Sequence, residues 1–313
     1  MRPKDALYIM GHERIRASAA LAELLGARGE PVVTRYALAT AAWRIYAEPD
    51  QLPSRVRRRQ LDRPAFLRLE SELIRQGMLR PVPGVAQHAA YTLLGAPAAA
   101  PGTLACALDP FCYLSHLSAM EFHGLSDRMP ELLYLSSPAP VPWRSFATAQ
   151  MQRDLGQAYA DFVQASLPGL QRIRFTRVAG HPIHLFRSLH LGAFRHFKQQ
   201  HLRVATLGRT FLNMLQEPGL CGGLDHVLSV FREHAATHAR LIFDELDQHG
   251  RAIDKVRAGW ILEEVCGIHD ARIDAWSGFA QRGGSQRLDA TAEYGPRFSE
   301  RWKLSLNVPL ALP

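Results

Sequence analysis

Acidic residues are missing from one long stretch of this sequence. Between Ser166 and Gln216 there is no aspartate or glutamate, whereas eight basic residues fall there. From Glu217 to Asp270 the balance reverses, with ten acids against five basic residues. A basic stretch of this length without an acid favours contact with an acidic partner. The change of sign falls within residues 203–223, where the local sequence pattern changes as well.

The sequence also lacks the features of secreted and membrane-inserted proteins. Its four cysteines include no CxxC pair, and the chain is too long for a small disulfide scaffold. The first residues contain no long apolar core, and no uncharged apolar run approaches the ~20 residues that a membrane span needs. We therefore expect a cytoplasmic protein with reduced thiols that does not insert into a membrane.

Sequence motifs of common enzymes are missing too. There is no GxSxG, no P-loop and no GxGxxG motif. Five of the fourteen histidines cluster between His181 and His201, but no HExxH or paired-cysteine motif accompanies them. We expect no catalytic activity, no metal and no cofactor. The enzyme alternative is a nuclease or another metal-dependent enzyme built on the basic stretch, which lacks the acids that nuclease metal sites require.

The size and charge of the chain point to two domains and a polyanionic partner. At 313 residues and 35.0 kDa the chain exceeds the usual size of a single domain. Its net charge of +8 and its pI near 9.6 favour a negatively charged partner, with nucleic acid as the first candidate.

The N-terminal part has the order of elements of a winged helix. Apolar residues at helical spacing predict helices over residues 17–25, 33–46 and 64–76. Residues 78–95 then contain two short extended runs around a Pro83-Gly84 turn, which is typical of a hairpin. In a winged helix the third helix enters a major groove, and the hairpin is the wing.

Basic side chains are concentrated in the same part. Residues 1–95 contain fifteen basic residues and nine acids, a balance of +6. Arginines recur along the third predicted helix, where contacts with phosphates and guanines are made; alternatively, they pair with Glu70 and Glu72 on a solvated face. An arginine run in the preceding loop attracts phosphates, or it is a disordered solubilising loop. The predicted DNA-binding residues are Arg55, Arg57, Arg58, Arg59, Arg63, Arg68, Arg75 and Arg80.

An uncharged, proline-rich connector at residues 96–102 separates this part from the next. Beyond it we expect a helix over residues 109–125 with Asp109 as its cap, a strand over 131–136 and a long helix over 147–166. Two alternating runs around Ala179-Gly180 then predict a hairpin. Its outward faces carry Arg172, Arg174, Thr176 and His184. We expect its arginines to form a basic sheet that faces nucleic acid or a protein partner: Arg172, Arg174, Arg177 and Arg187.

The last part changes from strand to helix. Residues 202–206 alternate like a strand, and residues 211–215 have helical spacing before Pro218. At this junction we expect Thr210 to cap the helix and Arg209 to bind backbone carbonyls. Further helices are predicted over 222–249 and 257–266, followed by an extended tail at a sheet edge. The predicted fold class is α+β, with a larger mixed C-terminal domain that ends in helices.

Two segments of the part that follows the connector resemble the AbiEi family of antitoxins. In that family a strand leads into an acid-Arg-Thr-Leu-Leu-Asp helix, followed by a proline and a Gly-Gly pair. This sequence keeps the Arg-Thr pair and has Gly208 and Asn213 in place of the two acids. The other segment is a Ser-x-x-Ser-Ala helix ending in His-Gly-Leu, and its matching residues are Ser115, Ser118, Ala119, His123, Gly124, Leu125, Asp127 and Pro130.

This resemblance implies a function in type IV toxin–antitoxin systems, which act in phage defence. Residues 1–95 would be the winged-helix DNA-binding domain, and residues 104–313 the antitoxin domain. The protein would bind double-stranded DNA at its own promoter, repress its own operon and counteract a nucleotidyltransferase-like toxin. A DNA-binding regulator that has no toxin partner remains the alternative outside the enzymes.

Overall fold

The computed structural model describes residues 17–47, 60–96, 98–280 and 286–307. The chain divides into two compact units, each made of two separate stretches of sequence. Unit 1 comprises residues 1–110 and 140–179, and unit 2 comprises residues 111–139 and 180–313. These units differ from the continuous ranges 1–95 and 104–313 that we expected. Both contain helices and strands, so the α+β class is confirmed.

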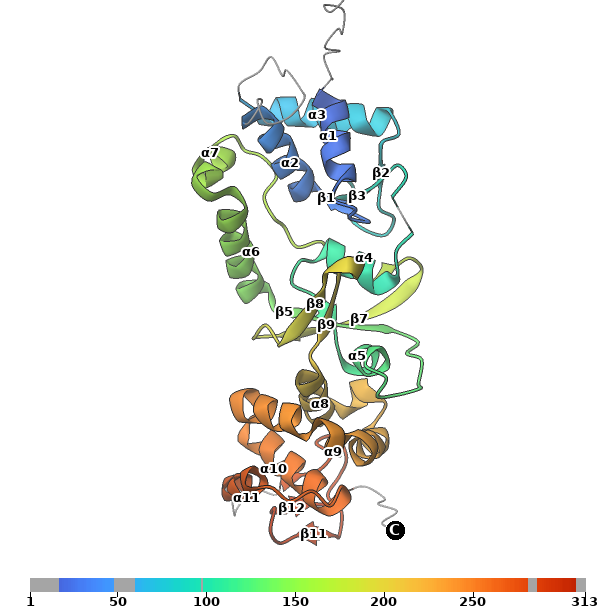
Figure 1. Ribbon diagram of the computed structural model, residues 1–313, viewed down its shortest axis with the longest axis vertical. Coiled ribbons are helices and arrows are strands. Elements are labelled where there is room, and N and C mark those ends of the chain that lie inside the picture. Colours follow the sequence, from blue (N-terminus) through green and yellow to red (C-terminus); the bar gives the residue numbers. More distant parts are fainter. Residues whose placement is uncertain (1–16, 48–59, 97, 281–285, 308–313) are drawn as a thin grey trace, which may run out of the picture. The chain divides into compact units, whose positions relative to one another are not determined.

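Unit 1 begins with three helices and a small sheet (Figure 1). The sheet has the order β1-β3-β2, and both of its strand pairs are antiparallel. The predicted three helices and hairpin are present, although residues 33–34 form a strand rather than the start of the second helix. The elements of this part are α1 (Ala17–Gly26), β1 (Val33–Thr34), α2 (Arg35–Ala47), α3 (Arg63–Arg75), β2 (Leu79–Pro81) and β3 (Ala90–Leu93).

Local signals account for the limits of α3. The Asp62 side chain accepts a hydrogen bond from the Ala65 backbone nitrogen at 2.8 Å, and Pro64 occupies the first turn, where its missing N–H costs nothing. Gly77 follows the helix with a φ of +73°, a conformation that favours glycine.

The remainder of unit 1 completes the hydrophobic core of the three helices. Phe162 is fully buried, and its ring centroid lies 5.7 Å from that of Trp43 and 6.3 Å from that of Tyr36. Leu167 belongs to the same cluster of buried side chains. The elements concerned are α4 (Pro101–Leu108), α6 (Pro140–Leu155), η1 (Gly156–Ala158), α7 (Tyr159–Gln164) and β6 (Arg177–Val178).

Unit 2 contains a mixed sheet in which five strands follow the order β7-β5-β4-β9-β8. The central β4 runs antiparallel to β5 and parallel to β9, while β5 is parallel to β7 and β8 is antiparallel to β9. The helix α5 (His116–Phe122) follows β4, and η2 (Lys198–Gln200) joins the last two strands. The strands are β4 (Tyr113–Leu114), β5 (Leu133–Pro138), β7 (His181–Ser188), β8 (Phe194–Phe197) and β9 (Leu202–Ala205).

The C-terminal part of unit 2 is mainly helical and has its own core around Phe211, Phe231 and Trp260 (Figure 1). This part also contains a three-stranded sheet with the strand order β10-β12-β11. Its elements are α8 (Leu207–Gln216), η3 (Pro218–Cys221), α9 (Leu224–His249), α10 (Ala252–Trp260), the π-helical turn η4 (Ile261–Val265), α11 (Ala271–Trp276), η5 (Ser277–Phe279), β10 (Gln286–Arg287), β11 (Phe298–Ser299) and β12 (Leu304–Ser305).

Three of the predicted elements are wrong in detail. The expected helix over residues 109–125 consists of a turn, β4 and α5, and Asp109 accepts a hydrogen bond from Trp143 Nε1 at 2.9 Å instead of capping a helix. The expected helix over 147–166 starts earlier, at Pro140, and is interrupted at Gly156. The extended tail supplies β12, which lies between two strands and not at a sheet edge. No helix in the described ranges is long and apolar enough to cross a membrane.

Candidate nucleic-acid interface

One face of α3 is exposed and carries basic and polar side chains. Phe66, Leu69 and Leu73 point into the core of unit 1, and this leaves the opposite side of the helix to solvent. A shallow groove on that side is lined by Leu67, Arg68, Ser71, Glu72 and Arg75. Residues three and four positions apart share a helix face, so this set forms one continuous stripe.

In the described ranges the two acids of α3 form no ion pair with these arginines, although Glu72 lies in the same groove. Glu70 is buried and accepts hydrogen bonds from Arg35 Nε at 2.8 Å and Arg35 Nη2 at 2.7 Å. Glu72 accepts a hydrogen bond from Gln76 Nε2 at 2.9 Å. Within the described ranges no carboxylate pairs with Arg68 or Arg75, so the alternative of a self-paired helix face is not observed.

A buried polar network holds α2, α3 and β3 together. The Tyr91 hydroxyl donates to Glu70 Oε1 at 2.8 Å and lies 2.9 Å from His88 Nδ1. The hydrogen bond that Arg35 donates to Glu70 raises the pKa of Arg35. Burial raises the pKa of Tyr91, and the hydrogen bond from Tyr91 to Glu70 raises it further. We did not predict this network, although an acid beside Leu69 on the apolar face of a helix signals a buried partner.

Of the other predicted DNA-binding residues, the structure describes only Arg63 and Arg80. Arg63 is exposed at the first position of α3, and Arg80 is exposed on β2 of the hairpin. Four more of the predicted residues lie outside the described residues: Arg55, Arg57, Arg58 and Arg59.

The predicted basic sheet is not formed as expected. Arg172 and Arg174 lie in a segment without regular structure, because Leu167 and Ile173 of that segment turn inward in place of strand pairing. The predicted turn at Ala179-Gly180 is present between β6, which carries Arg177, and β7, on which Arg187 is exposed. Because Arg172 and Arg174 precede β6, the four arginines do not lie on the two strands of this hairpin.

The two segments that carry the family resemblance pack against each other in unit 2. His123 Nε2 lies 2.7 Å from the carbonyl oxygen of Ala205, at the end of β9, and burial lowers the pKa of His123. Arg128 Nη1 donates to the carbonyl of Gly222 at 3.1 Å. Gly124 ends α5 with a φ of +66°, which confirms the structural function predicted for it. These segments thus form one structural core.

At the start of α8 the capping residue is Thr206 and not Thr210. The Thr206 hydroxyl accepts a hydrogen bond from the Arg209 backbone nitrogen at 3.3 Å, because Thr206 has the extended backbone of a cap. Thr210 lies inside the helix and donates back to the Thr206 carbonyl at 2.9 Å. The expectation that Arg209 binds carbonyls is also wrong, since its Nη2 pairs with Glu245 Oε1 of α9 at 2.6 Å.

Close packing of α9 leaves no room for a side chain at Gly208. A Cβ atom added at Gly208 would lie 2.5 Å from the Leu241 carbonyl oxygen and 2.9 Å from the Glu245 Cβ. The acid that the resemblance leads us to expect at this position has no room. The carboxylate next to Arg209 comes from Glu245 instead. Asn213, which replaces the second acid, is buried in α8.

No family model matches this chain, and no curated protein matches it. Among solved structures, the crystal structure of the RV2827C protein from Mycobacterium tuberculosis is similar, with a TM-score of 0.49 and 14% sequence identity. The similarity covers 92% of this chain and 90% of that chain. A likeness at this level carries no inference about function.

Ligands for a metal do not converge in the part of the chain that the structure describes. No group of three or more histidine, cysteine, aspartate or glutamate side chains there is placed to hold a metal ion. The candidate interface itself presents the exposed side chains of Arg63, Arg68 and Arg75.

Proposed function

We propose that this protein is a DNA-binding regulator whose N-terminal helices and hairpin form a winged helix. The observation that carries the proposal is the orientation of α3, which turns Glu70 into the core while Arg68, Ser71 and Arg75 line an exposed groove, together with Glu72. Guanidinium and hydroxyl groups on one exposed helix face are suited to contacts with base edges and phosphates in a major groove. The hairpin that follows carries Arg80 and is the proposed wing.

Replacing the exposed arginines of α3 tests this proposal. Arg68→Ala and Arg75→Ala are each expected to weaken binding to DNA from the region upstream of the gene by about 1 to 3 kcal/mol if the side chains reach bases. If the side chains contact phosphates instead, each substitution should weaken binding to all DNA sequences equally, and the binding constant should depend less steeply on salt concentration. Gel shifts with the full chain, specific DNA and scrambled DNA at two salt concentrations distinguish these results.

The matched control for this experiment is Arg144→Ala. Arg144 is an exposed arginine of α6 in the same unit, outside the α3 groove. Its replacement removes the same charge and is expected to leave specific binding unchanged. If both α3 variants bind DNA as the unchanged protein does, α3 is not the recognition element.

We further propose that the protein is an AbiEi-like antitoxin that represses its own operon and opposes a nucleotidyltransferase-like toxin by binding and not by catalysis. The support is the resemblance of two segments of unit 2 to that family and their contact through His123 and Ala205. Because the matched residues lie in unit 2 and the α3 arginines in unit 1, repression and toxin neutralisation should be separable by substitution.

A growth rescue assay tests the antitoxin function. The full chain and the nucleotidyltransferase-like protein encoded beside it are expressed from unrelated promoters, so that repression has no influence. We expect growth to be restored, and restored equally by the double variant Arg68→Ala with Arg75→Ala. If the folded chain restores no growth, the antitoxin proposal fails. If that outcome is combined with intact operator binding, the protein is a regulator without a toxin partner.

A further inference from the structure

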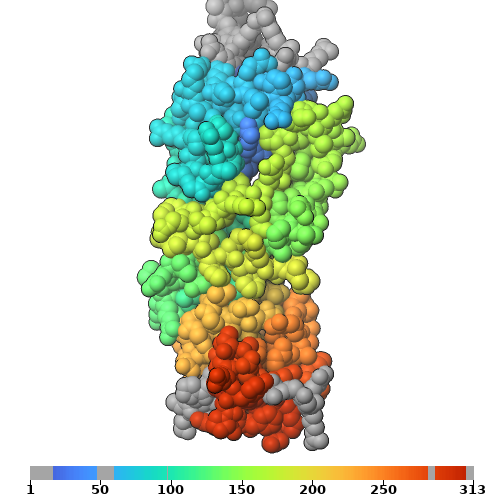
Figure 2. Space-filling view, turned by 180° about the vertical axis from the view of Figure 1, so that it is seen from behind, coloured from blue at the N-terminus to red at the C-terminus, as the bar shows by residue number. Residues whose placement is uncertain are grey.

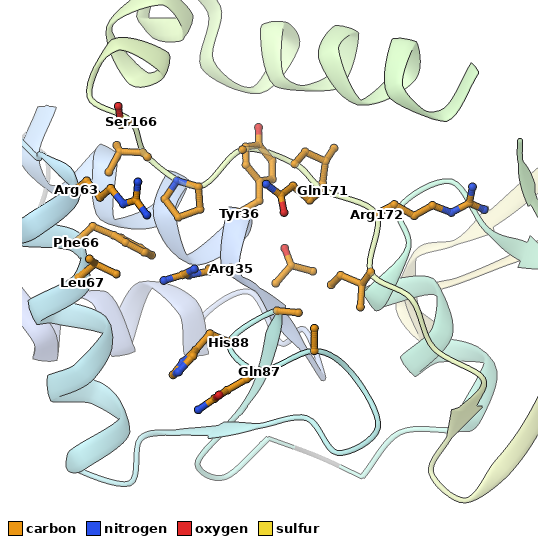
Figure 3. A pocket seen from close by; sticks show the side chains of 18 of the residues that line it. Arg35, Tyr36, Arg63, Phe66, Leu67, Gln87, His88, Ser166, Gln171 and Arg172 are labelled. Carbon is orange, nitrogen blue, oxygen red and sulfur yellow. The ribbon is translucent and has the colours of Figure 1, made fainter. Parts of the chain in front are cut away.

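A cavity of about 470 Å³ lies within unit 1, beside the first turn of α3. Its walls are the start of α2, the first turn of α3, the loop 86–89 before β3 and the segment 166–174 (Figure 3). Figure 2 shows the hollow from outside, with blue residues of the first helices at its base between cyan and yellow-green residues. Cavities of this size hold small organic molecules.

The charge that lines this cavity is positive. Arg35 lies at its base and donates hydrogen bonds from Nε and Nη2 to Glu70, which compensates its charge. Glu70 thereby holds the guanidinium in a fixed orientation. The Nη1 of Arg35 has no acceptor among the described residues and is left for a ligand. Arg63 and Arg174 also line the cavity, which has no aspartate or glutamate in its lining. In Figure 3 the Arg63 side chain points toward the segment 166–174, whereas Arg172 points away.

The rest of the lining combines apolar and aromatic side chains with polar ones such as Gln87, His88 and Gln171. The Phe66 ring lies next to Arg35, whose guanidinium carbon is 5.9 Å from the ring centroid. Tyr36, Leu67 and Leu170 add to this wall. A fixed cation beside an aromatic ring favours a ligand that combines a negative charge with a flat apolar body.

We propose that this cavity binds a small organic anion and that the bound anion weakens the interaction of α3 with DNA. Walls on several sides keep a rigid duplex from the base of the cavity, whereas a small molecule reaches Arg35. The coupling to DNA rests on the proposed function. The coupling is expected because the two sites are adjacent: Leu67 lines both the cavity and the α3 groove. An anion in the cavity would therefore lie within a Debye length of the phosphates of DNA bound at α3.

Binding is measured first without DNA. The full chain is titrated calorimetrically with mononucleotides, sugar phosphates and aromatic carboxylates, each paired with its uncharged analogue. We expect at least one anion to bind, and its uncharged analogue to bind about tenfold more weakly or worse, as the loss of a charge-assisted hydrogen bond implies. Arg63→Ala and Arg174→Ala should weaken binding by a similar factor, whereas Arg144→Ala should not. Ala86→Trp, which places a large side chain on the exposed loop of the lining, should block it.

The outcomes separate the two parts of the proposal. If no anion binds, if the uncharged analogues bind equally, or if the arginine and tryptophan variants bind as the unchanged protein does, the site is not an anion site. If Arg63→Ala and Arg174→Ala weaken only DNA binding, the cavity belongs to the DNA surface. In gel shifts, the bound anion should lower DNA affinity severalfold, and DNA should lower anion affinity by the same factor. Anion binding by a protein that binds no DNA would refute the proposed function and the coupling while leaving the site intact.

Discussion

Replacing Phe162 by alanine is expected to lower the free energy of unfolding of unit 1 by about 3 to 5 kcal/mol, the usual cost of deleting a buried phenylalanine ring. Phe162 is fully buried and meets the rings of Tyr36 and Trp43 edge to face. Its removal leaves a cavity between α7 and α2 and also removes the aromatic contacts. Urea unfolding followed by tryptophan fluorescence measures the loss, and hydrogen exchange in α2 and α3 peptides assigns it to unit 1.

The neighbouring residue provides the control. Val163 is 51% exposed on the same short helix, so Val163→Ala is expected to change stability by no more than about 0.5 kcal/mol. Equal stability of the two variants would show that residues 140–179 are not part of this core. The same packing implies that residues 1–95 alone, which lack Phe162 and Leu167, are less stable than the complete unit. DNA-binding experiments therefore need the full chain.

Removing either partner of the Arg209–Glu245 pair is expected to destabilise unit 2 by about 3 to 5 kcal/mol, because the remaining charge is left without its counter-ion in a largely buried site. The side chains of Arg209 and Glu245 are only 13% and 10% exposed, and Nη2 lies 2.6 Å from Oε1. Arg209→Ala and Glu245→Ala should each lower the melting temperature. The double variant should cost less than the sum of the two, since neither unpaired charge remains.

An ion pair on the same long helix supplies the comparison. Arg240 and Asp244 are 90% and 47% exposed, and water screens their interaction, so Arg240→Ala is expected to leave the melting temperature nearly unchanged. A double variant as destabilised as the sum of the single variants would indicate that Arg209 and Glu245 act independently. Such a result would contradict the assignment of this pair as the connection between α8 and α9.

Several helices near both ends of the chain were predictable, because the sequence patterns that indicate a helix are local. The spacing of apolar residues indicated α1, α3 and α9, and their observed bounds are close to the predicted ones. Gly124 was predicted to end a helix, since a left-handed residue after the last turn strongly favours glycine. Helix period and glycine conformation depend on neighbouring residues only, so one sequence suffices to read them.

Pairing across the chain was decided only by the tertiary structure. Residues 140–179 pack with the N-terminal helices because Phe162 and Leu167 are buried in the hydrophobic core of those helices. The local sequence around Phe162 and Leu167 does not indicate which distant residues they contact. The alternation around Arg172 predicted a strand, but this segment has no regular structure, and Ile173 within it is buried. The ion pairs Arg35–Glu70 and Arg209–Glu245 likewise join residues that are far apart in the sequence. The helices with a regular apolar spacing therefore followed from local sequence, whereas the partner of each charge and ring depended on which surfaces folding brought together.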